Sequence, residues 1–147
     1  MTPDERIVDA VERLMVEAIG VTTVALAQAA PDVDLTVAQW RGLVVVGSSP
    51  GGIRVGEIAA RIGSAVPTTS RLVRRLERRG LVVAERDEAD RRATLVRLTE
   101  SGETIRTAIV ERRRQLVRDA LSARPEALSA ELSGGLTEIE AALHRYE

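Results

Sequence analysis

Apolar side chains near the start of the chain recur at steps of three and four residues, the spacing of one face of an α-helix. This pattern predicts a long helix from Asp4 to about Ala29. The segment Ala30-Pro31-Asp32 ends it, because the residue before a proline disfavours helical backbone. The predicted apolar face of this helix consists of Ile7, Val11, Leu14, Ala18, Val21 and Ala25.

A second helix is predicted to begin at Thr36. Thr36 and Gln39 match a capping box, in which each side chain accepts a hydrogen bond from the other residue's backbone amide. Leu35 and Trp40 occupy the positions of a hydrophobic staple, an apolar contact that fixes how the chain enters a helix. The Ser-, Pro- and Gly-rich turn of residues 48–52 ends this helix and leads into a short strand.

The centre of the chain predicts a helix-turn-helix unit. A third helix, over residues 55–62, meets a fourth at Gly63, where glycine permits a sharp turn. The small side chain of Ala59 lets the two helices approach closely. Gly80 ends the fourth helix. Its predicted inward face consists of Val66, Thr69, Val73 and Leu76.

A β-hairpin and two further helices complete the predicted fold. The hairpin pairs residues 81–86 with residues 93–98 around an acid-rich, solvated tip. Thr99 caps a fifth helix, which runs to about Ala123. Pro125 separates it from a last helix, whose apolar face consists of Leu128, Leu132, Leu136, Ile139, Leu143 and Tyr146.

The two ends of the chain carry more apolar helix surface than the small centre can cover. We therefore expect the terminal helices to pack together and against a second copy of the chain, in a symmetric homodimer. The predicted fold class is mainly α with a small β-hairpin wing. We expect residues 1–147 to form a single domain, in which a winged helix-turn-helix (residues 35–99) is flanked by helical dimerisation regions (residues 1–30 and 100–147).

Charge is separated along the chain. Residues 61–97 contain ten arginines and five acidic residues, a net charge of +5, whereas the whole chain carries −1 and the other residues therefore carry −6. All 21 basic residues are arginine, whose planar guanidinium can bind phosphate or guanine through two donors at once. This distribution predicts that one face of the centre binds a polyanion.

Several kinds of chemistry are not expected. The chain has no cysteine, so it has no disulfide, thiolate metal site or cysteine redox switch. His144 is the only histidine, which disfavours a metal site or a serine triad. We therefore expect no metal, no cofactor and no catalysis. The first residues have the pattern of neither a signal peptide nor a membrane span, and we expect a cytoplasmic protein with no membrane partner.

The fourth helix is the strongest functional signal. Its outward surface carries four arginines, and the only acid in the helix is Glu77. The alternative, a solvated helix whose arginines pair with local acids, would leave most of these charges unpaired. Because the major groove of double-stranded DNA admits an α-helix, we predict that Pro67, Thr68 and Arg71 lie at the DNA, with Thr68 and Arg71 at base edges. The later arginines, expected to hold phosphates, are Arg74, Arg75 and Arg78.

The tip of the hairpin is the second signal. Asp90, Arg91 and Arg92 could form only a soluble turn, but an arginine at the end of a protruding ribbon can enter a narrow, electronegative minor groove. We predict that Arg92 has this role and that Asp90 orients it. Another group of arginines, residues 112–114 and Arg118, points in several directions around its helix and is predicted to form an exposed face.

Three segments carry a family resemblance: LTVAQWRGLVVV, VGEIAARIGSAVPTTSRLVRRLERRGLV and ERDEADRRATLVRLTESG. From Leu35 to Gly102 the chain resembles the MarR family of bacterial winged helix-turn-helix regulators, and the DRR and LTESG motifs are the most specific. The resemblance implies a triangular homodimer, joined through the first, fifth and sixth helices, that reads a pseudo-palindromic operator. It also implies a transcription factor, usually a repressor, that loses DNA affinity when a small aromatic or phenolic molecule binds.

The resemblance also assigns DNA contacts to individual positions. Arg92, with Asp90 beside it, matches the wing contact. Many members carry an acid immediately before the recognition-helix arginine that Arg75 matches. This chain has Arg74 there, so it lacks a group that can restrain the wing arginine. The matching recognition-helix positions are Pro67, Thr68, Ser70, Arg71 and Arg75.

Two other functions stay open from the sequence. One is a winged-helix adaptor that binds an acidic partner protein, and the other is a small-molecule binding protein or enzyme that keeps the fold without the DNA role. The arginines of the fourth helix and of the hairpin tip favour DNA over both. The effector-binding site is unknown. Trp40 is a candidate wall for it, although a staple with Leu35 explains this residue equally well.

Overall fold

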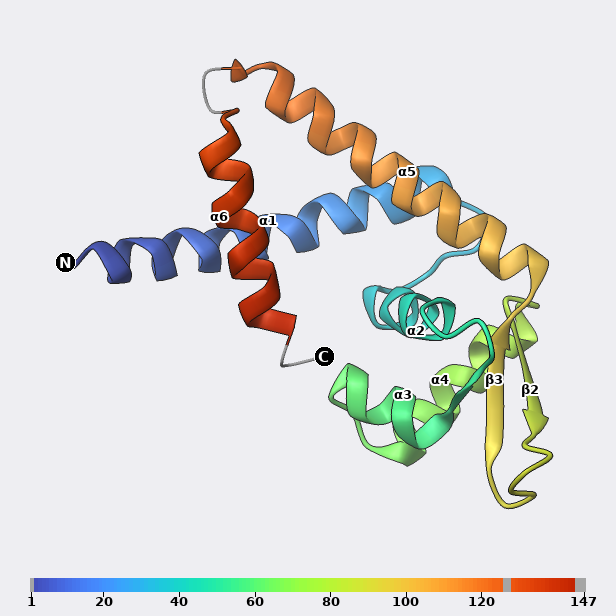
Figure 1. Cartoon of the computed structure of the whole chain (residues 1–147). Coiled ribbons are helices and arrows are strands. Elements are labelled where there is room, and N and C mark those ends of the chain that lie inside the picture. The colour runs from blue at the N-terminus through green and yellow to red at the C-terminus, as the bar shows by residue number, and fades with distance from the viewer. Residues whose placement is uncertain (1, 126–127, 145–147) are drawn as a thin grey trace.

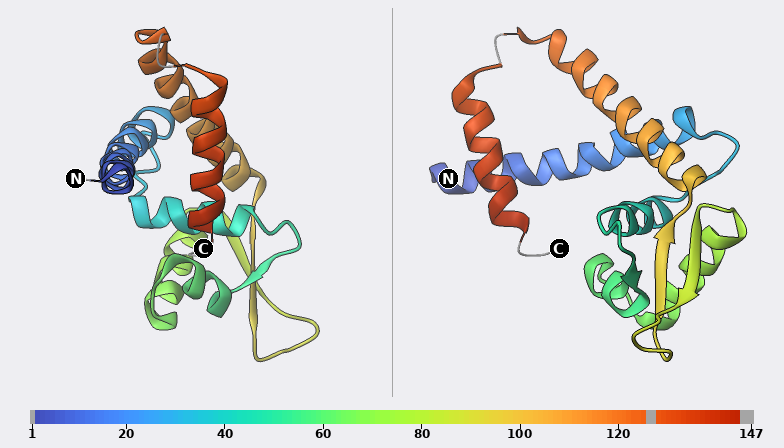
Figure 2. Two further views of the ribbon diagram at one scale, coloured as in Figure 1. Left: turned by 60° about the vertical axis from the view of Figure 1, so that its left-hand side comes forward. Right: turned by 45° about the vertical axis from the view of Figure 1, so that its right-hand side comes forward.

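The computed structural model describes residues 2–125 and 128–144. Helices α1, α5 and α6 enclose a triangle, and the other elements form a winged module below the corner where α1 and α5 meet (Figure 1, Figure 2). In chain order the elements are α1 (Pro3–Ala29), α2 (Val37–Gly47), β1 (Ile53–Arg54), α3 (Val55–Ile62), α4 (Val66–Arg78), β2 (Val82–Arg86), β3 (Thr94–Leu98), α5 (Glu100–Ser122) and α6 (Ala130–Leu143).

Local sequence signals start and stop the helices as predicted. Thr36 Oγ1 accepts a hydrogen bond from the Gln39 amide at 3.2 Å, and Gln39 Oε1 accepts one from the Thr36 amide at 3.0 Å. Thr99 Oγ1 caps α5 by accepting from a backbone amide of its first turn at 3.0 Å. Gly63 and Gly80 have φ values of 66° and 68°, the left-handed backbone that favours glycine where a helix ends.

The predicted hairpin is the larger part of a three-stranded antiparallel sheet with the order β1-β3-β2. Strand β1 pairs with only two residues in the middle of β3, where Ile53 lies opposite Val96 and Arg54 opposite Leu95. Strands β2 and β3 continue as a pair to Arg86 and Thr94 and project beyond the rest of the module (Figure 1). This two-stranded projection is the wing.

Helix α5 is joined to the module by an unusually close backbone approach. Gly102, in the first turn of α5, lies so near the carbonyl group of Leu81 that no Cβ atom would fit there. The same Leu81 carbonyl accepts a hydrogen bond from the Thr99 amide at 3.1 Å. Thr99 Oγ1 also donates to the carbonyl of Gly80 at 2.6 Å. The start of α5 therefore has a fixed position relative to the end of α4.

Two details of the helices differ from the prediction, and one predicted position is not described. Val66 was predicted to face inward but is 50% exposed, because it opens α4 and the first turn lies outside the core. The other three predicted inward positions of α4 are buried. The last helix begins only at Ala130, so Leu128 precedes it and is 53% exposed. Tyr146 lies outside the described residues.

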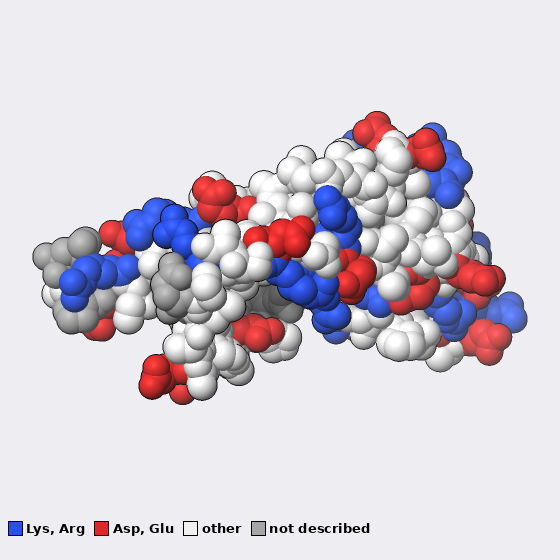
Figure 3. Space-filling view, turned by 90° about the horizontal axis from the view of Figure 1, so that it is seen from above, with Lys and Arg blue, Asp and Glu red and all other residues white. Residues whose placement is uncertain are grey.

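The terminal helices pack together only in part. Helix α1 packs along α5, as predicted, and its apolar face is buried at Ala25 and Leu26. Toward the N-terminus the same face is at least half exposed at Ile7, Leu14 and Met15. Helix α6 buries none of its residues. Seen from above, the molecule is elongated, and its charged side chains are scattered between broad uncharged areas (Figure 3).

No helix in the described ranges combines the length and the apolarity that crossing a membrane requires. In the same ranges, histidine and acidic side chains nowhere gather in the groups of three or more that could hold a metal ion.

Candidate nucleic-acid interface

Helix α4 presents four arginines on one side. Arg71, Arg74, Arg75 and Arg78 follow the three- and four-residue spacing of neighbours on a helix surface, and with Glu77 they line a shallow groove of about 520 Å³. The Glu77 carboxylate accepts a hydrogen bond from a backbone amide of β2 at 3.2 Å. In the described structure no ion pair joins any of these arginines to an acid, so the face is strongly positive.

The start of α4 carries the predicted base-reading residues. Pro67 and Thr68 are exposed, and the Arg71 guanidinium donates to the Pro67 carbonyl at 3.3 Å. Thr68, Arg71 and Arg75 line a second groove of about 280 Å³ against the start of α2. Ser70 is half-buried, and its hydroxyl donates to a carbonyl one turn earlier at 2.9 Å. The Ser70 side chain is therefore the least accessible of the predicted contacts.

The wing tip is held in shape by two turns that join side chains to the backbone. Asp87 Oδ1 accepts from the Ala89 amide at 2.9 Å, and Asp90 Oδ1 accepts from the Arg92 amide at 3.1 Å. Asp90 thus contacts Arg92 through the backbone and not through the guanidinium. Arg91 and Arg92 are exposed, and among the described residues neither has an ion pair with an acid.

Some of the arginines between residues 61 and 97 bind protein groups and are not free for a partner. The Arg79 guanidinium donates to Gln39 Oε1 at 3.1 Å and to the Asp34 carbonyl at 3.0 Å, which ties the end of α4 to α2. The Arg97 guanidinium donates to Glu85 Oε2 at 3.0 Å. Sequence alone could not separate these structural arginines from those that face outward. The charge available to a partner is concentrated on α4 and the wing tip.

An ion pair that the sequence did not suggest joins β1 to the wing. The Arg54 guanidinium donates to Asp87 Oδ2 through Nε at 3.0 Å and through Nη2 at 2.7 Å. The two residues are 33 positions apart, so no local pattern connects them. Hydrogen bonds from Arg54 and from the Ala89 amide hold the pKa of Asp87 below its usual value. Because the pKa of this carboxyl is lower in the folded than in the unfolded protein, its ionised form stabilises the fold at pH values above the unfolded pKa of about 3.9. This stabilisation is lost as the pH falls through the pKa of the folded protein.

Two of the four α5 arginines predicted to form an exposed face are half-buried, whereas Arg114 and Arg118 are exposed as predicted. Arg112 is half-buried and donates to Gln28 Oε1 of α1 at 2.7 Å. Arg113 is also half-buried, and its guanidinium lies 6.0 Å from the centre of the Trp40 ring, within the range of a cation–π contact. Trp40 itself is 4% exposed and, like Leu35, belongs to the core. These contacts connect α5 to α1 and α2.

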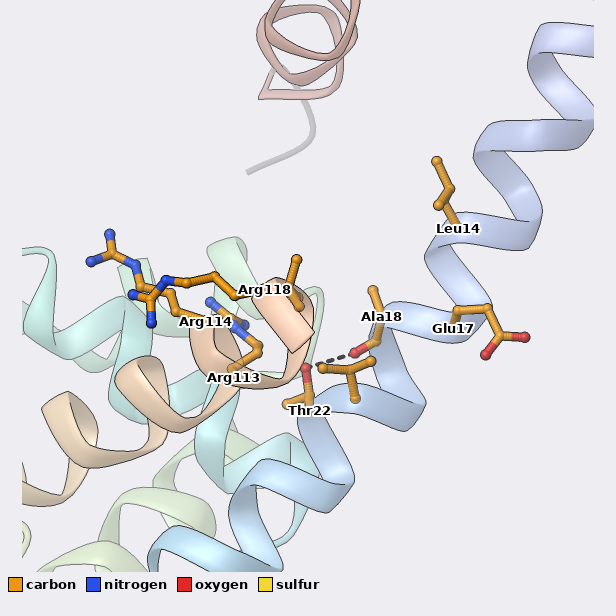
Figure 4. A pocket seen from close by; sticks show the side chains of 9 residues that line it. Leu14, Glu17, Ala18, Thr22, Arg113, Arg114 and Arg118 are labelled. Carbon is orange, nitrogen blue, oxygen red and sulfur yellow. Dashed lines mark hydrogen bonds between the residues drawn. The ribbon is translucent and has the colours of Figure 1, made fainter. Parts of the chain in front are cut away.

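A groove of about 670 Å³ lies between α1 and α5. Figure 4 shows side chains entering it from both helices, with the arginines on the α5 side. The Thr22 hydroxyl donates to the Ala18 carbonyl at 2.7 Å. The residues that line the groove are Leu14, Glu17, Ala18, Val21, Thr22, Arg113, Arg114, Val117 and Arg118.

The winged module matches known proteins in sequence. A model of the MarR family matches residues 33–93. The transcriptional regulator HosA of Escherichia coli O157:H7 is 38% identical over 77 residues, which cover 52% of this chain and 56% of HosA. The transcriptional regulator YfiV of Bacillus subtilis is 32% identical over 79 residues, which cover 54% of this chain and 49% of YfiV. The chain thus spans about half the length of the curated relatives it matches.

Solved structures match nearly the whole chain. RV1404 from Mycobacterium tuberculosis superposes with a TM-score of 0.82 at 25% identity, over 97% of this chain and 95% of that one. The transcriptional repressor CouR, solved bound to a 23-mer DNA duplex, superposes with a TM-score of 0.71 at 26% identity, over 92% of this chain and 89% of CouR. The MarR family model thus matches the winged module, and the agreement over the flanking helices shows that the whole chain shares its fold with these solved structures.

Proposed function

We propose that this protein is a homodimeric transcriptional regulator that binds double-stranded DNA sequence-specifically. The observation that carries the proposal is the face of four unpaired arginines on α4 beside a wing with two unpaired arginines at its tip. A surface of this charge attracts the phosphate backbone. The structure of CouR bound to DNA supports this proposal.

The proposed contacts divide between the two grooves of DNA. Helix α4 enters the major groove, where Thr68 and Arg71 meet base edges and the later arginines hold phosphates. Arg92 enters the adjacent minor groove, which attracts arginine where it is narrow. The proposed DNA-binding residues are Pro67, Thr68, Ser70, Arg71, Arg74, Arg75, Asp90, Arg91 and Arg92, of which Asp90 acts by orienting Arg92.

We propose a homodimer because the apolar faces of α1 and α6 are only partly covered within one chain. Residues 1–30 and 100–147 then act as the dimerisation region, and residues 35–99 act as the DNA-binding module. Two modules related by a twofold axis suit a pseudo-palindromic operator, whose half-sites lie about 10 bp apart, one turn of the double helix.

The groove between α1 and α5 is the proposed effector site. Its floor is apolar at Leu14, Ala18 and Val21, and Arg113 and Arg114 supply positive charge, a combination that suits a small aromatic or phenolic anion. Since Arg113 also lies over Trp40 of α2, a ligand there would act on the link between α5 and the module. A repressor of this kind would release labelled operator DNA when the compound is added.

Replacing Arg92 with alanine should weaken binding to operator DNA by about tenfold, because one desolvated arginine in a groove contributes about 1–3 kcal/mol. Fluorescence anisotropy with labelled operator measures the change. Arg124→Ala is the matched control, since it removes the same charge at the far end of α5. An Arg92→Ala variant that is monomeric or unfolded would mean that the tip has a structural role and that the DNA contact is misplaced.

A further inference from the structure

Arg54 occupies the position that caps α3, but its side chain makes no capping hydrogen bond. Helix caps are usually short polar side chains such as Ser, Thr, Asp or Asn. In this helix Glu57 Oε2 accepts a hydrogen bond from the Arg54 amide at 3.0 Å instead. The long Arg54 side chain is therefore not needed to start the helix. It extends away from α3 toward the wing, where its guanidinium meets Asp87.

Asp87 connects this guanidinium to the wing tip. Its Oδ2 accepts from Arg54, its Oδ1 accepts from the Ala89 amide at 2.9 Å, and its own amide donates to the Ala93 carbonyl at 3.0 Å. The Asp87 side chain is only 14% exposed, against 45% for Arg54. An ion pair between two exposed side chains contributes little to stability. Asp87 is less accessible to solvent than the partners in such a pair.

The wing needs such a contact because beyond Arg54, the last residue of β1, it has only two strands. Strand β1 pairs with β3 only at Ile53 and Arg54, whereas the β2–β3 ladder continues to Arg86. A two-stranded ribbon has little stability or stiffness of its own. Asp87 is the first residue beyond β2, so the Arg54 side chain extends the support from β1 as far as the base of the tip.

We propose that Arg54 is a positioning residue, which acts through Asp87 to fix the wing tip relative to α4. The proposal rests on the proposed DNA-binding function, because it concerns how Arg92 is presented to the minor groove. It assigns no DNA contact to Arg54 itself. The free protein should therefore have an ordered tip before any DNA is bound.

Asp87→Asn tests the proposal because two explanations predict opposite results. Removal of a negative charge beside a polyanion would by itself leave operator affinity unchanged or raise it. If Asp87 holds the tip in place, affinity should fall about fivefold to tenfold, since a misplaced arginine loses its minor-groove contact. Glu88→Gln is the matched control, because it removes the same charge from the adjacent exposed residue and should not weaken binding. The proposal is wrong if the Asp87→Asn variant binds operator as tightly as the Glu88→Gln variant.

Charge reversal separates positioning from direct DNA contact. Arg54→Ala should weaken binding as much as Asp87→Asn, and the two changes combined should weaken it no further, because both break one interaction. Arg54→Asp combined with Asp87→Arg should recover part of the affinity, because it restores the ion pair but not the hydrogen bond from the Ala89 amide to Asp87. Failure of the reversed pair to recover any affinity would instead indicate that Arg54 contacts DNA itself.

Nuclear magnetic resonance of the free protein gives a readout that does not depend on DNA. Backbone order parameters of residues 88–92 should fall below about 0.6 in Asp87→Asn and stay near about 0.85 in Glu88→Gln. Unchanged order in Asp87→Asn would overturn the proposal even if the protein binds DNA. If the wild-type protein shows no preference for operator over random duplex, the proposed function fails, and the order parameters still decide the role of Arg54.

Discussion

Replacing Gly102 with alanine is expected to lower the free energy of unfolding by about 3 kcal/mol. This value is near the upper end of the usual cost of adding an atom to a closely packed site. The new Cβ atom would lie 2.9 Å from the carbonyl carbon of Leu81 and closer still to its oxygen. That oxygen also accepts the hydrogen bond from the Thr99 amide. The backbone on both sides must therefore move apart. For a chain of this size the midpoint of thermal unfolding should fall by roughly 10 °C.

Gly20→Ala is the matched control for this experiment. Gly20 lies in α1 with no atom within 4 Å of an added Cβ, so alanine should be neutral or stabilise the helix by about 1 kcal/mol through its higher helix propensity. Both variants are measured by thermal and urea unfolding. Equal stability of the Gly102 and Gly20 variants would show that α5 and the end of α4 do not approach each other as closely as described.

Replacing Met15 with glutamate is expected to weaken the proposed dimer by at least about 100-fold, because burying an unpaired carboxylate costs about 3–5 kcal/mol. Met15 is 50% exposed and lines the groove between α1 and α6 with Leu136 and Ile139. Glutamate is a good helix former, so α1 itself should remain intact. DNA affinity should fall in parallel, since one module cannot hold two half-sites.

Val16→Glu is the control for this change. Val16 is the neighbour of Met15 in α1 and is 66% exposed, but it points about 100° away around the helix and outside the apolar face. Sedimentation velocity over a range of protein concentrations gives the dimer dissociation constant of each variant. If both variants associate as tightly as the wild-type protein, the dimer does not use this face of α1.

The helices and the wing were predictable from the sequence because their signals are local. The capping box at Thr36, the glycine turns at Gly63 and Gly80, and the acid-rich tip each lie within a few residues of the feature they specify. Val66 was misplaced because periodicity does not show that the first turn of a helix projects past the core.

The contacts that position the wing and α5 were not predictable because they join residues far apart in the chain. Arg54 and Asp87 are separated by 33 residues, and neither lies in a pattern that suggests the other. Gly102 was visible as part of the LTESG motif, but its close approach to Leu81 depends on the packing of α5 against the module. Counting arginines likewise overestimated the positive face, because Arg79 and Arg97 bind groups within the protein.

The most direct test of the proposed function is the binding of the wild-type protein to DNA. A labelled duplex from the region upstream of its own gene is titrated by fluorescence anisotropy at two salt concentrations, with unlabelled random duplex as competitor. A DNA-binding regulator should bind at about 10 nM or tighter, resist the competitor and weaken steeply with salt. Binding no tighter than to random duplex would contradict the proposed function and favour an acidic protein partner for the arginines of α4.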